Sequence, residues 1–322
     1  IFVGLRPELI VGDTDLVKLI LGKEFKKFPN RRFVSSDHYY VGSKGLFVLN
    51  FESWRRVRAI TTPAFTSGKL RRMQPFIEEC VDTLLLTFEK AANSGKSVDV
   101  KKMMSAFSMD VISSCAFGTK IDSQNNPTNP VVVNALKFFG TGFSIIRLIA
   151  FLFPKLITIS LVAKISIMFR LSAFDYDAQI FLGNLMRHIL KERELNEKSK
   201  RNDFIQLLAD ARLDANSIST ESKDEADYGF LKEGYLKKLD TQEIIDQGIT
   251  FFIAGFDTTS TCLSSTARWL AMNPDVQSKL CAEIDETFDF GSLEVDYNTL
   301  NEMKYLDAVV KESLRMSPPT SR

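Results

Sequence analysis

The chain has 322 residues, of which 45% are hydrophobic, so it is long enough to bury a sizeable core. Its 41 basic and 40 acidic residues leave a formal charge of only +1, which gives no reason to expect a nucleic-acid partner. The two histidines, His38 and His188, are far apart in sequence, which argues against a multi-histidine metal site and against a histidine-centred hydrolase.

Other residue counts favour an apolar interior. The 26 phenylalanines, against 7 tyrosines and 2 tryptophans, favour apolar cavities or membrane contact over a polar substrate cleft. The cysteines show no CxxC pair and lie in helical, mostly apolar patterns. We therefore expect buried free thiols rather than a disulfide framework at Cys80, Cys115, Cys262 and Cys281.

Strand signals are confined to the start of the chain, where Ile1–Val3 and Glu8–Val11 are expected to form a hairpin. After an irregular stretch over Val34–Gly45, nearly every segment has a helical pattern. The predicted fold class is therefore mostly α with a small β element. In chain order, the predicted helices are Asp13–Leu21, Ser67–Asn93, Asp99–Phe117, Asp175–Glu197, Asp203–Arg212, residues 240–272, Pro274–Phe288 and Met303–Met316.

Three segments differ from this helical pattern. Asn125–Pro130 is a turn cluster, and Ala215–Gly234 reads as a surface loop. Phe143–Leu171 is strongly apolar, but charged residues and a proline interrupt it, whereas a spanning helix needs about 20 apolar residues. We expect residues 143–171 to form helices that roof a cavity and place an apolar face in a membrane surface.

The most informative segment lies in the middle of the long helix over residues 240–272. Gly255, Asp257 and Thr258 stand there among apolar residues, and each is unfavourable inside a buried helix. The Thr258 hydroxyl is expected to bond the carbonyl of Ala254, loosen the helical ladder and open room for a small molecule beside Gly255. The alternative is a buried helix with a chance polar patch.

Two further residue pairs have helical spacing. Trp54 and Arg58, at i and i+4, share a helix face and offer two hydrogen-bond donors that suit a carboxylate of a large planar ligand. The alternative is a surface helix with its tryptophan buried in the core. Glu312 and Arg315, at i and i+3, can form an ion pair, which is weak evidence by itself.

The order of these motifs is what identifies a family. The chain resembles the cytochrome P-450 (heme-thiolate monooxygenase) family in the order of three motifs: Trp54 to Arg58, then Ala254 to Thr258, then Glu312 to Arg315. Longer segments resemble its eukaryotic microsomal clan with vertebrate family 3 and insect families 6 and 9: WRRVRAITTPAFTSGKLRRM, SMDVISSCAFGTKIDSQNNP, FFIAGFDTTS and KYLDAVVKESLR. The resemblance covers essentially the whole chain and implies a single partial monooxygenase domain over residues 1–322, with the cytochrome P-450 fold.

The resemblance implies catalytic and cofactor roles for particular residues. Thr258 would orient dioxygen and hold water, and Asp257 would help to relay protons. Ala254 and Gly255 would form the oxygen-binding groove beside the heme. The heme propionates would be held by Trp54, Arg58 and, in a similar position, Arg31.

The resemblance also implies residues that line the substrate cavity and a structural pair. The substrate cavity above the heme would be lined by Phe47, Phe251, Phe252 and Ile253. An apolar cavity with few polar groups suits lipophilic substrates. Glu312 and Arg315 would form a core ion pair with a structural role.

The implied function is insertion of one oxygen atom of O2 into a lipophilic small molecule, xenobiotic or steroid-like. NADPH–cytochrome reductase would supply electrons at the cytoplasmic face of the endoplasmic reticulum membrane. Basic residues could serve this acidic partner or form a solvated face: Arg55, Arg56, Lys69, Arg71 and Arg72. The alternative from another class is a non-catalytic α-helical binding or membrane-interaction protein.

One departure from the family pattern concerns the heme iron. The resemblance implies an axial cysteine in a loop that would follow Arg322, and none of the cysteines present has that context. Cys262 lies one turn after Thr258. The resemblance would place it on the oxygen side of the heme ring, opposite the side of the axial cysteine. We therefore expect the chain to be a fragment, without its anchor and cysteine loop, that is itself inactive.

Overall fold

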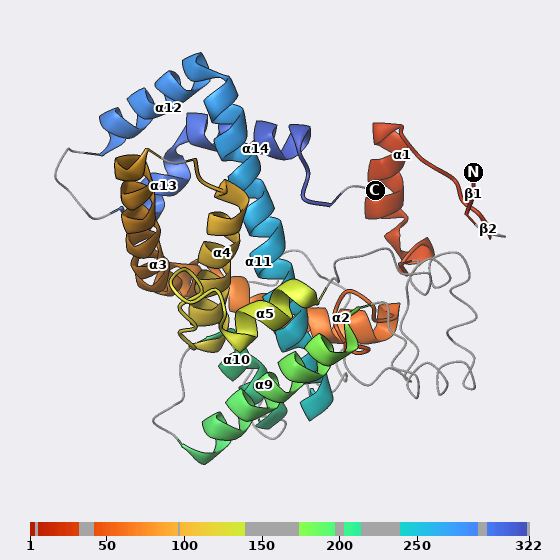
Figure 1. Ribbon diagram of the computed structural model, residues 1–322. Coiled ribbons are helices and arrows are strands. Elements are labelled where there is room, and N and C mark those ends of the chain that lie inside the picture. The colour runs from red at the N-terminus through yellow and green to blue at the C-terminus, as the bar shows by residue number, and fades with distance from the viewer. Residues whose placement is uncertain are drawn as a thin grey trace. The chain divides into compact units, whose positions relative to one another are not determined.

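The computed structural model describes residues 1–3, 6–31, 42–95, 97–138, 174–196, 203–213, 239–288 and 295–320. The segments predicted as a membrane-facing roof, residues 143–171, and as a surface loop, residues 215–234, lie outside the described residues. Helices dominate what is described, and the single strand pair lies near the N-terminus (Figure 1). The predicted fold class, mostly α with a small β element, is therefore confirmed.

The chain divides into two compact units. Unit 1 comprises Ile1–Ala64 and Val133–Thr250, and unit 2 comprises Phe65–Val132 and Phe251–Arg322. Helix α11, Thr241–Met272, contributes its first ten residues to unit 1 and the rest to unit 2. Within the described part of the chain, no helix is both long and apolar enough to span a bilayer.

Unit 1 begins with the antiparallel pair β1 (Phe2–Val3) and β2 (Arg6–Pro7). The hairpin was predicted, but its second strand precedes the expected Glu8–Val11. The remaining elements of the unit are α1 (Thr14–Lys18), a π-helical turn (Leu19–Lys23), a 3-10 turn (Phe25–Lys27), α2 (Phe51–Thr61), α9 (Tyr176–Leu195) and α10 (Phe204–Leu213). The short helix α5 (Pro130–Lys137), which crosses the unit boundary in sequence, was not predicted.

Side-chain caps define where several of these helices start. Asp13 accepts hydrogen bonds from the backbone N–H groups of Asp15 and Leu16, as expected for the start of α1. Asp175 caps α9 in the same way, and Asn50 caps α2 through the N–H of Ser53. The helix after Asp13 runs past Gly22 as a π-helical turn, so its predicted end at Leu21 is too early.

A buried ion pair joins α9 to α10. Arg193 lies 2.6 Å from Asp203, and both side chains are less than a tenth exposed. Gln206 completes the arrangement, because it accepts from Arg193 and donates to Asp210. Removal of one member of such a pair would leave a buried charge uncompensated.

Unit 2 contains η3 (Thr62–Phe65, in part), α3 (Ser67–Ser94), α4 (Val100–Phe117), α12 (Pro274–Thr287), α13 (Tyr297–Glu302) and α14 (Lys304–Met316). Helix α3 packs against α4, and α12 packs against α14 (Figure 1). Asp99 caps α4, and Gly95 and Gly118 end α3 and α4 with φ of +63° and +58°. These boundaries agree with the prediction, whereas α13 was not predicted.

The four cysteines are free thiols in different environments. Cys80 and Cys115 are buried in unit 2, and burial raises the pKa of Cys80 to about 11 and that of Cys115 to about 12. Cys262 is half-buried and Cys281 is exposed. The expectation of buried thiols is thus confirmed for the first two and wrong for Cys281, which is exposed on α12.

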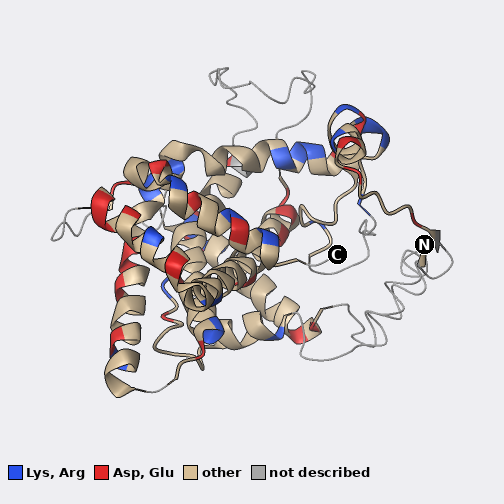
Figure 2. Ribbon diagram, turned by 90° about the horizontal axis from the view of Figure 1, so that it is seen from above, with Lys and Arg blue, Asp and Glu red and all other residues tan. Residues whose placement is uncertain are grey.

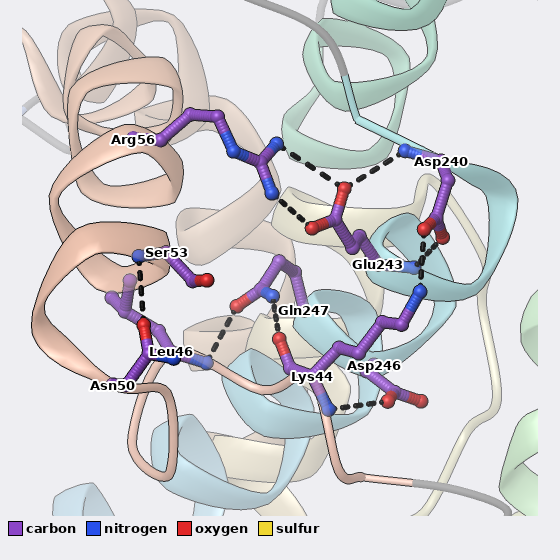
Figure 3. A network of polar contacts seen from close by, with 9 residues as sticks. All are labelled: Lys44, Leu46, Asn50, Ser53, Arg56, Asp240, Glu243, Asp246 and Gln247. Atoms are coloured by element: carbon purple, nitrogen blue, oxygen red, sulfur yellow. Dashed lines mark hydrogen bonds and ion pairs between the residues drawn. The ribbon is translucent and has the colours of Figure 1, made fainter. Parts of the chain in front are cut away.

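The first turns of α11 hold the segment that leads into α2 (Figure 3). The Lys44 ammonium lies 2.5 Å from the Asp240 carboxylate at the start of α11. Burial acts to raise the pKa of Asp240, but hydrogen bonds from Lys44 and from the backbone N–H of Glu243 hold it below its usual 3.8. The hydrogen bond to Asp240 correspondingly raises the pKa of Lys44 above 10.5, against the effect of burial.

We predict that this pair stabilises unit 1 only within a pH window. Lys44→Met should lower the free energy of unfolding of the full-length protein at pH 7 by at most about 1 kcal/mol, because the pair is partly exposed. A carboxyl with a lowered pKa adds stability above its unfolded value and loses it as the pH falls through its folded value. The difference between variant and wild type should therefore be fully present above pH 3.8, the usual pKa of Asp240, and vanish as the pH falls through the lower folded value.

The difference should vanish again at alkaline pH, since a lysine with a raised pKa loses its contribution as the pH rises through the folded value, above 10.5. Urea unfolding across the pH range measures both limits. Lys102→Met, at an exposed lysine on α4, is the control. A difference that stays constant at every pH would contradict the assignment.

Candidate functional site

Helix α2 presents two hydrogen-bond donors. Trp54 and Arg58 lie four residues apart on this helix, as the sequence predicted. Both side chains are half-buried. The Trp54 ring packs against Phe25 and Phe51, with ring centroids 5.8 and 6.2 Å away. Among the described residues, neither the Trp54 indole N–H nor the Arg58 guanidinium has a hydrogen-bond partner. The indole body is thus fixed by apolar contacts while both donors remain available to a ligand.

Arg31 and Phe47 contact each other in the same unit. The Arg31 guanidinium lies 4.5 Å from the centroid of the Phe47 ring and donates to the Phe47 carbonyl at 3.4 Å. Phe47 is 60% exposed. Arg31, expected to hold a propionate, therefore stacks on the residue expected to line the substrate cavity, and such a contact contributes about 0.5–1 kcal/mol at an exposed site.

The middle of α11 is an unbroken α-helix whose hydroxyls bond its own carbonyls. The Thr258 hydroxyl donates to the carbonyl of Ala254 at 2.6 Å, which confirms the predicted bond. The helix nevertheless runs without interruption from Thr241 to Met272, so the expected local widening is absent. Ala254 is exposed and Thr258 is half-buried, so this turn presents an accessible face.

Gly255 has a different neighbour from the one expected. A Cβ atom at this position would lie 2.8 Å from the Cδ1 atom of Ile112 and 2.9 Å from its Cγ1 atom. The side chain of Ile112, on α4, therefore occupies the space beside Gly255 where the sequence predicted room for a small molecule. Gly255 permits close approach of α4 to α11, and the accessible part of this turn is at Ala254 and Thr258 instead.

The predicted cavity-lining residues of α11 divide into two kinds. Phe252 and Ile253 are at most 6% exposed, and Phe252 packs against Phe117 and Phe256 in the core of unit 2. That placement differs from the expected cavity wall, because both side chains are buried. Phe251 is half-buried, stacks on Phe65 at 5.4 Å and lies one turn before Ala254. Phe251 thus extends the accessible face with an aromatic surface.

Asp257 is bound by a lysine that the sequence analysis did not connect with it. The Lys101 ammonium, on α4, lies 3.2 Å from the Asp257 carboxylate and donates to the hydroxyls of Ser260 and Thr261 at 2.7 and 2.6 Å. Successive helix residues point about 100° apart, so Asp257 faces α4 while Thr258 lies on a different face. In this structure the acid and the alcohol do not form a direct pair.

Glu312 and Arg315 form the predicted ion pair on α14, with two contacts of 2.7 Å. The hydrogen bond from Arg315 holds the pKa of Glu312 below its usual range and raises that of Arg315. The two side chains are 59% and 66% exposed. The expectation of a core pair is therefore wrong for the described residues, where both charges remain in water.

The predicted basic cluster is not a set of free cations. Arg56 forms a two-point contact with Glu243, and its side chain is only 22% exposed, so it belongs neither to a solvated face nor to a free basic surface. In unit 2, Arg71 donates to Asn298 and lies over the ring of Tyr297. Lys and Arg are interspersed with Asp and Glu along the described helices (Figure 2).

Three contacts of functional interest were absent from the sequence prediction: Lys101 with Asp257, Arg56 with Glu243, and Gln247 with the backbone of Lys44 and Leu46. The first two join residues more than 150 positions apart, and no local pattern indicates them. Gln247 could have been found, because a polar amide among the apolar residues Ile244, Ile245 and Ile249 must meet a polar partner.

Comparison with known proteins agrees with the motifs. The sequence model of the family described as Cytochrome P450 matches residues 1–322. The chain is 35% identical to "Cytochrome P450 3A6" of Oryctolagus cuniculus, 37% to "Cytochrome P450 3A2" of Rattus norvegicus and 36% to "Cytochrome P450 3A5" of Homo sapiens. These alignments include 99–100% of the chain and 59–60% of the relatives, so the chain spans about three fifths of their length.

The packing of Ile112 against Gly255 predicts that the effect of Gly255→Ala on stability changes sign when the Ile112 side chain is removed. Gly255→Ala should destabilise the full-length protein by about 1–2 kcal/mol, because overpacking against Ile112 outweighs the gain of about 1 kcal/mol in helix propensity. In an Ile112→Ala background the same substitution should become stabilising by about 1 kcal/mol. Denaturant unfolding of the four proteins measures both changes.

Gly68 in α3 provides the control, since a Cβ there would meet nothing within 4 Å. Gly68→Ala should change stability by the same amount in both Ile112 backgrounds. If Gly255→Ala keeps the same sign with and without the Ile112 side chain, the close approach of α4 is not the reason for the glycine.

Proposed function

The chain belongs to the cytochrome P450 family, and on that premise we propose that the full-length protein is a heme-dependent monooxygenase. It inserts one oxygen atom of O2 into a lipophilic small molecule of xenobiotic or steroid-like character. The observation that carries the proposal is the Thr258 hydroxyl, bonded to the Ala254 carbonyl on an accessible face of a long helix. When bound, the heme would supply the activation of O2, and Trp54, Arg58 and Arg31 would hold its carboxylates.

The residues of α2 fit the carboxylates of such a cofactor. The Trp54 indole N–H and the Arg58 guanidinium share one face and have no hydrogen-bond partner among the described residues. A neutral and a charged donor together suit a carboxylate, with the charged bond the stronger of the two. Arg31, which lies against Phe47, is the third donor that we assign to the carboxylates.

The hydroxyl of Thr258 acts as an acceptor in this proposal. Its proton is committed to the Ala254 carbonyl at 2.6 Å, so the lone pairs of Oγ1 remain free to accept a hydrogen bond from a water molecule. A water held there is a proton donor beside the accessible face. The Asp257 side chain is 46% exposed, and its contact with Lys101 holds it on the α4 side, so a role in proton relay requires it to leave that contact.

The substrate class follows from the apolar neighbours of this face. Phe251 and Ala254 lie one turn apart, and the partly exposed ring of Phe65 stacks on Phe251. An aromatic surface next to one hydroxyl suits a lipophilic ligand. The family resemblance implies that Ala254 and Gly255 lie on the oxygen side and Phe47, Phe251, Phe252 and Ile253 on the substrate side. Of the residues on α11, we assign direct contact with a ligand to Ala254 and Phe251, whose side chains are accessible.

The partners and location that we propose also come from the family resemblance. NADPH–cytochrome reductase would supply electrons, and the protein would act on the cytoplasmic face of the endoplasmic reticulum membrane. Arg72 and Lys69 are the basic residues nearest to Arg71 on α3, which itself binds Asn298. A reduced carbon-monoxide difference spectrum of the full-length protein tests the cofactor: a Soret band at the thiolate position supports the proposal, and its absence favours a non-catalytic helical protein.

Removal of the Thr258 hydroxyl should uncouple electron use from product formation. Thr258→Val keeps the shape of the side chain but loses the acceptor, so product formed per NADPH should fall roughly fivefold, the effect of a hydrogen bond worth about 1 kcal/mol. Thr258→Ser should retain most of the coupling. The measurement compares NADPH consumed, product and hydrogen peroxide in the full-length protein.

Thr259 provides the matched control, because it is the adjacent threonine and its side chain is exposed. Thr259→Val should leave the ratio of product to NADPH unchanged. Normal coupling in Thr258→Val would show that the hydroxyl does not hold the proton donor.

Lys101 should affect turnover only through Asp257. Asp257→Asn should slow turnover by about a hundredfold if the carboxyl relays protons. Lys101→Met should speed it by up to fivefold, because Asp257 no longer has to leave a partly exposed ion pair worth about 1 kcal/mol. In the Asp257→Asn background, Lys101→Met should have no further effect on the rate or on its solvent isotope effect. Lys102→Met is the control, and additive effects of the two substitutions would contradict the link.

A further inference from the structure

Gln247 of α11 binds the backbone of the segment that precedes α2 (Figure 3). Its side-chain oxygen accepts from the N–H of Leu46 at 2.8 Å, and its side-chain nitrogen donates to the carbonyl of Lys44 at 2.5 Å. Gln247 is completely buried. The contact requires a donor and an acceptor on one planar group, which an amide offers and an aliphatic or carboxylate side chain does not.

Asp246, the preceding residue of α11, holds the same segment from a second point. It is also completely buried, and its carboxylate accepts from the backbone N–H of Lys44 at 2.8 Å and from the Gln242 amide at 2.8 Å. Burial raises its pKa, while the backbone N–H groups of Gly42 and Lys44 act in the opposite direction. Two successive buried side chains thus satisfy the backbone of residues 42–46.

Gly45 shows how closely this segment lies on the helix. A Cβ atom at Gly45 would be 2.3 Å from the hydroxyl oxygen of Thr250, one turn after Asp246. The Thr250 hydroxyl itself is fixed, because it donates to the carbonyl of Asp246 at 2.7 Å. Any larger residue at position 45 would push the segment away from α11.

A charged pair fixes α2 itself to the first turn of α11. The Arg56 guanidinium makes two hydrogen bonds to the carboxylate of Glu243, whose side chain is 9% exposed (Figure 3). Glu243 also accepts from the backbone N–H of Asp240 at 2.9 Å, so its carboxylate cannot turn away without loss of that bond. A bidentate, largely buried pair sets orientation as well as distance.

The position of Arg56 determines where Trp54 and Arg58 point. Both residues are two positions from Arg56, which places each about 200° around the helix from it. When Arg56 faces Glu243, the two donors are therefore presented on the opposite side of α2. A rotation of α2 about its axis would move both donors together.

We propose that Gln247 and the Arg56–Glu243 pair are positioning residues for the helix that binds the heme carboxylates. They fix the approach of residues 44–46 and the rotation of α2 on the first turns of α11, and so aim Trp54 and Arg58. The segment that they hold also carries Phe47. This inference rests on the proposed function for the cofactor, while the placement of α2 can be tested without it.

The test uses Gln247→Leu in the full-length protein, with Gln206→Leu as the matched control. Both glutamines are buried in unit 1, and Gln206 has its polar contacts with Arg193 and Asp210 rather than with residues 42–56. Each substitution leaves polar partners unsatisfied, so both should lower the unfolding midpoint by similar amounts. A difference between them therefore reports position rather than general stability.

The first readout is the rate at which heme leaves for an excess of an apoprotein scavenger. Gln247→Leu should accelerate release about tenfold, which corresponds to about 1.4 kcal/mol, and Gln206→Leu should not. Arg56→Met should act like Gln247→Leu, and Arg56→Lys should restore part of the effect. Equal release rates for Gln247→Leu and Gln206→Leu would overturn the proposal.

The second readout needs no heme. The chain has two tryptophans, so Trp269→Phe leaves Trp54 as the only one within residues 1–322. In that background, assayed on the heme-free protein with any tryptophan outside these residues also replaced, Gln247→Leu should increase acrylamide quenching of Trp54 while Gln206→Leu leaves it unchanged. If the wild-type protein binds no heme, the proposed function fails and this readout still decides whether Gln247 positions α2; unchanged quenching would overturn the inference.

Discussion

The structure depends on one constraint: polar side chains buried on α11 need partners, and all but a few find them, the hydroxyl of Thr266 being an exception among the described residues. The hydroxyls of Thr250, Thr258, Thr261 and Ser264 each donate to the carbonyl four residues earlier. Larger polar groups cannot turn back in this way, so they reach other segments. Gln247 binds the backbone before α2, and Asp257 meets Lys101 of α4. The helix thereby organises its surroundings in each unit through its few polar positions.

Local signals were sufficient to predict most helix boundaries. Asp13, Asp99 and Asp175 each satisfy the first free N–H groups of a helix through their own carboxylates, and Gly95 and Gly118 end helices in a left-handed conformation. These effects depend on residues within one turn, so a sequence displays them directly. The helices α5 and α13 were missed because eight and six residues give too little periodicity to stand out.

The site was less predictable because its contacts are long-range. Thr258 and Ala254 are four residues apart, and their bond could be predicted from helix geometry alone. Lys101 and Asp257 are 156 positions apart, and their contact depends on how α4 packs. The same packing places Ile112 against Gly255, where the sequence alone predicted an open groove. Local chemistry was thus visible in the sequence, whereas the partner on another helix was not.

The residue type at position 258 reflects a second requirement, a fixed orientation of the hydroxyl. Serine has the same hydroxyl, but its side chain rotates more freely, whereas the β-branch of threonine restricts χ1. With its proton held by Ala254 O, the Thr258 oxygen keeps one orientation and directs its lone pairs to a fixed place. Because α11 remains regular here, the hydroxyl needs no break in the helix to be positioned. A regular helix with an exposed alanine one turn earlier therefore presents the Thr258 oxygen on an accessible face.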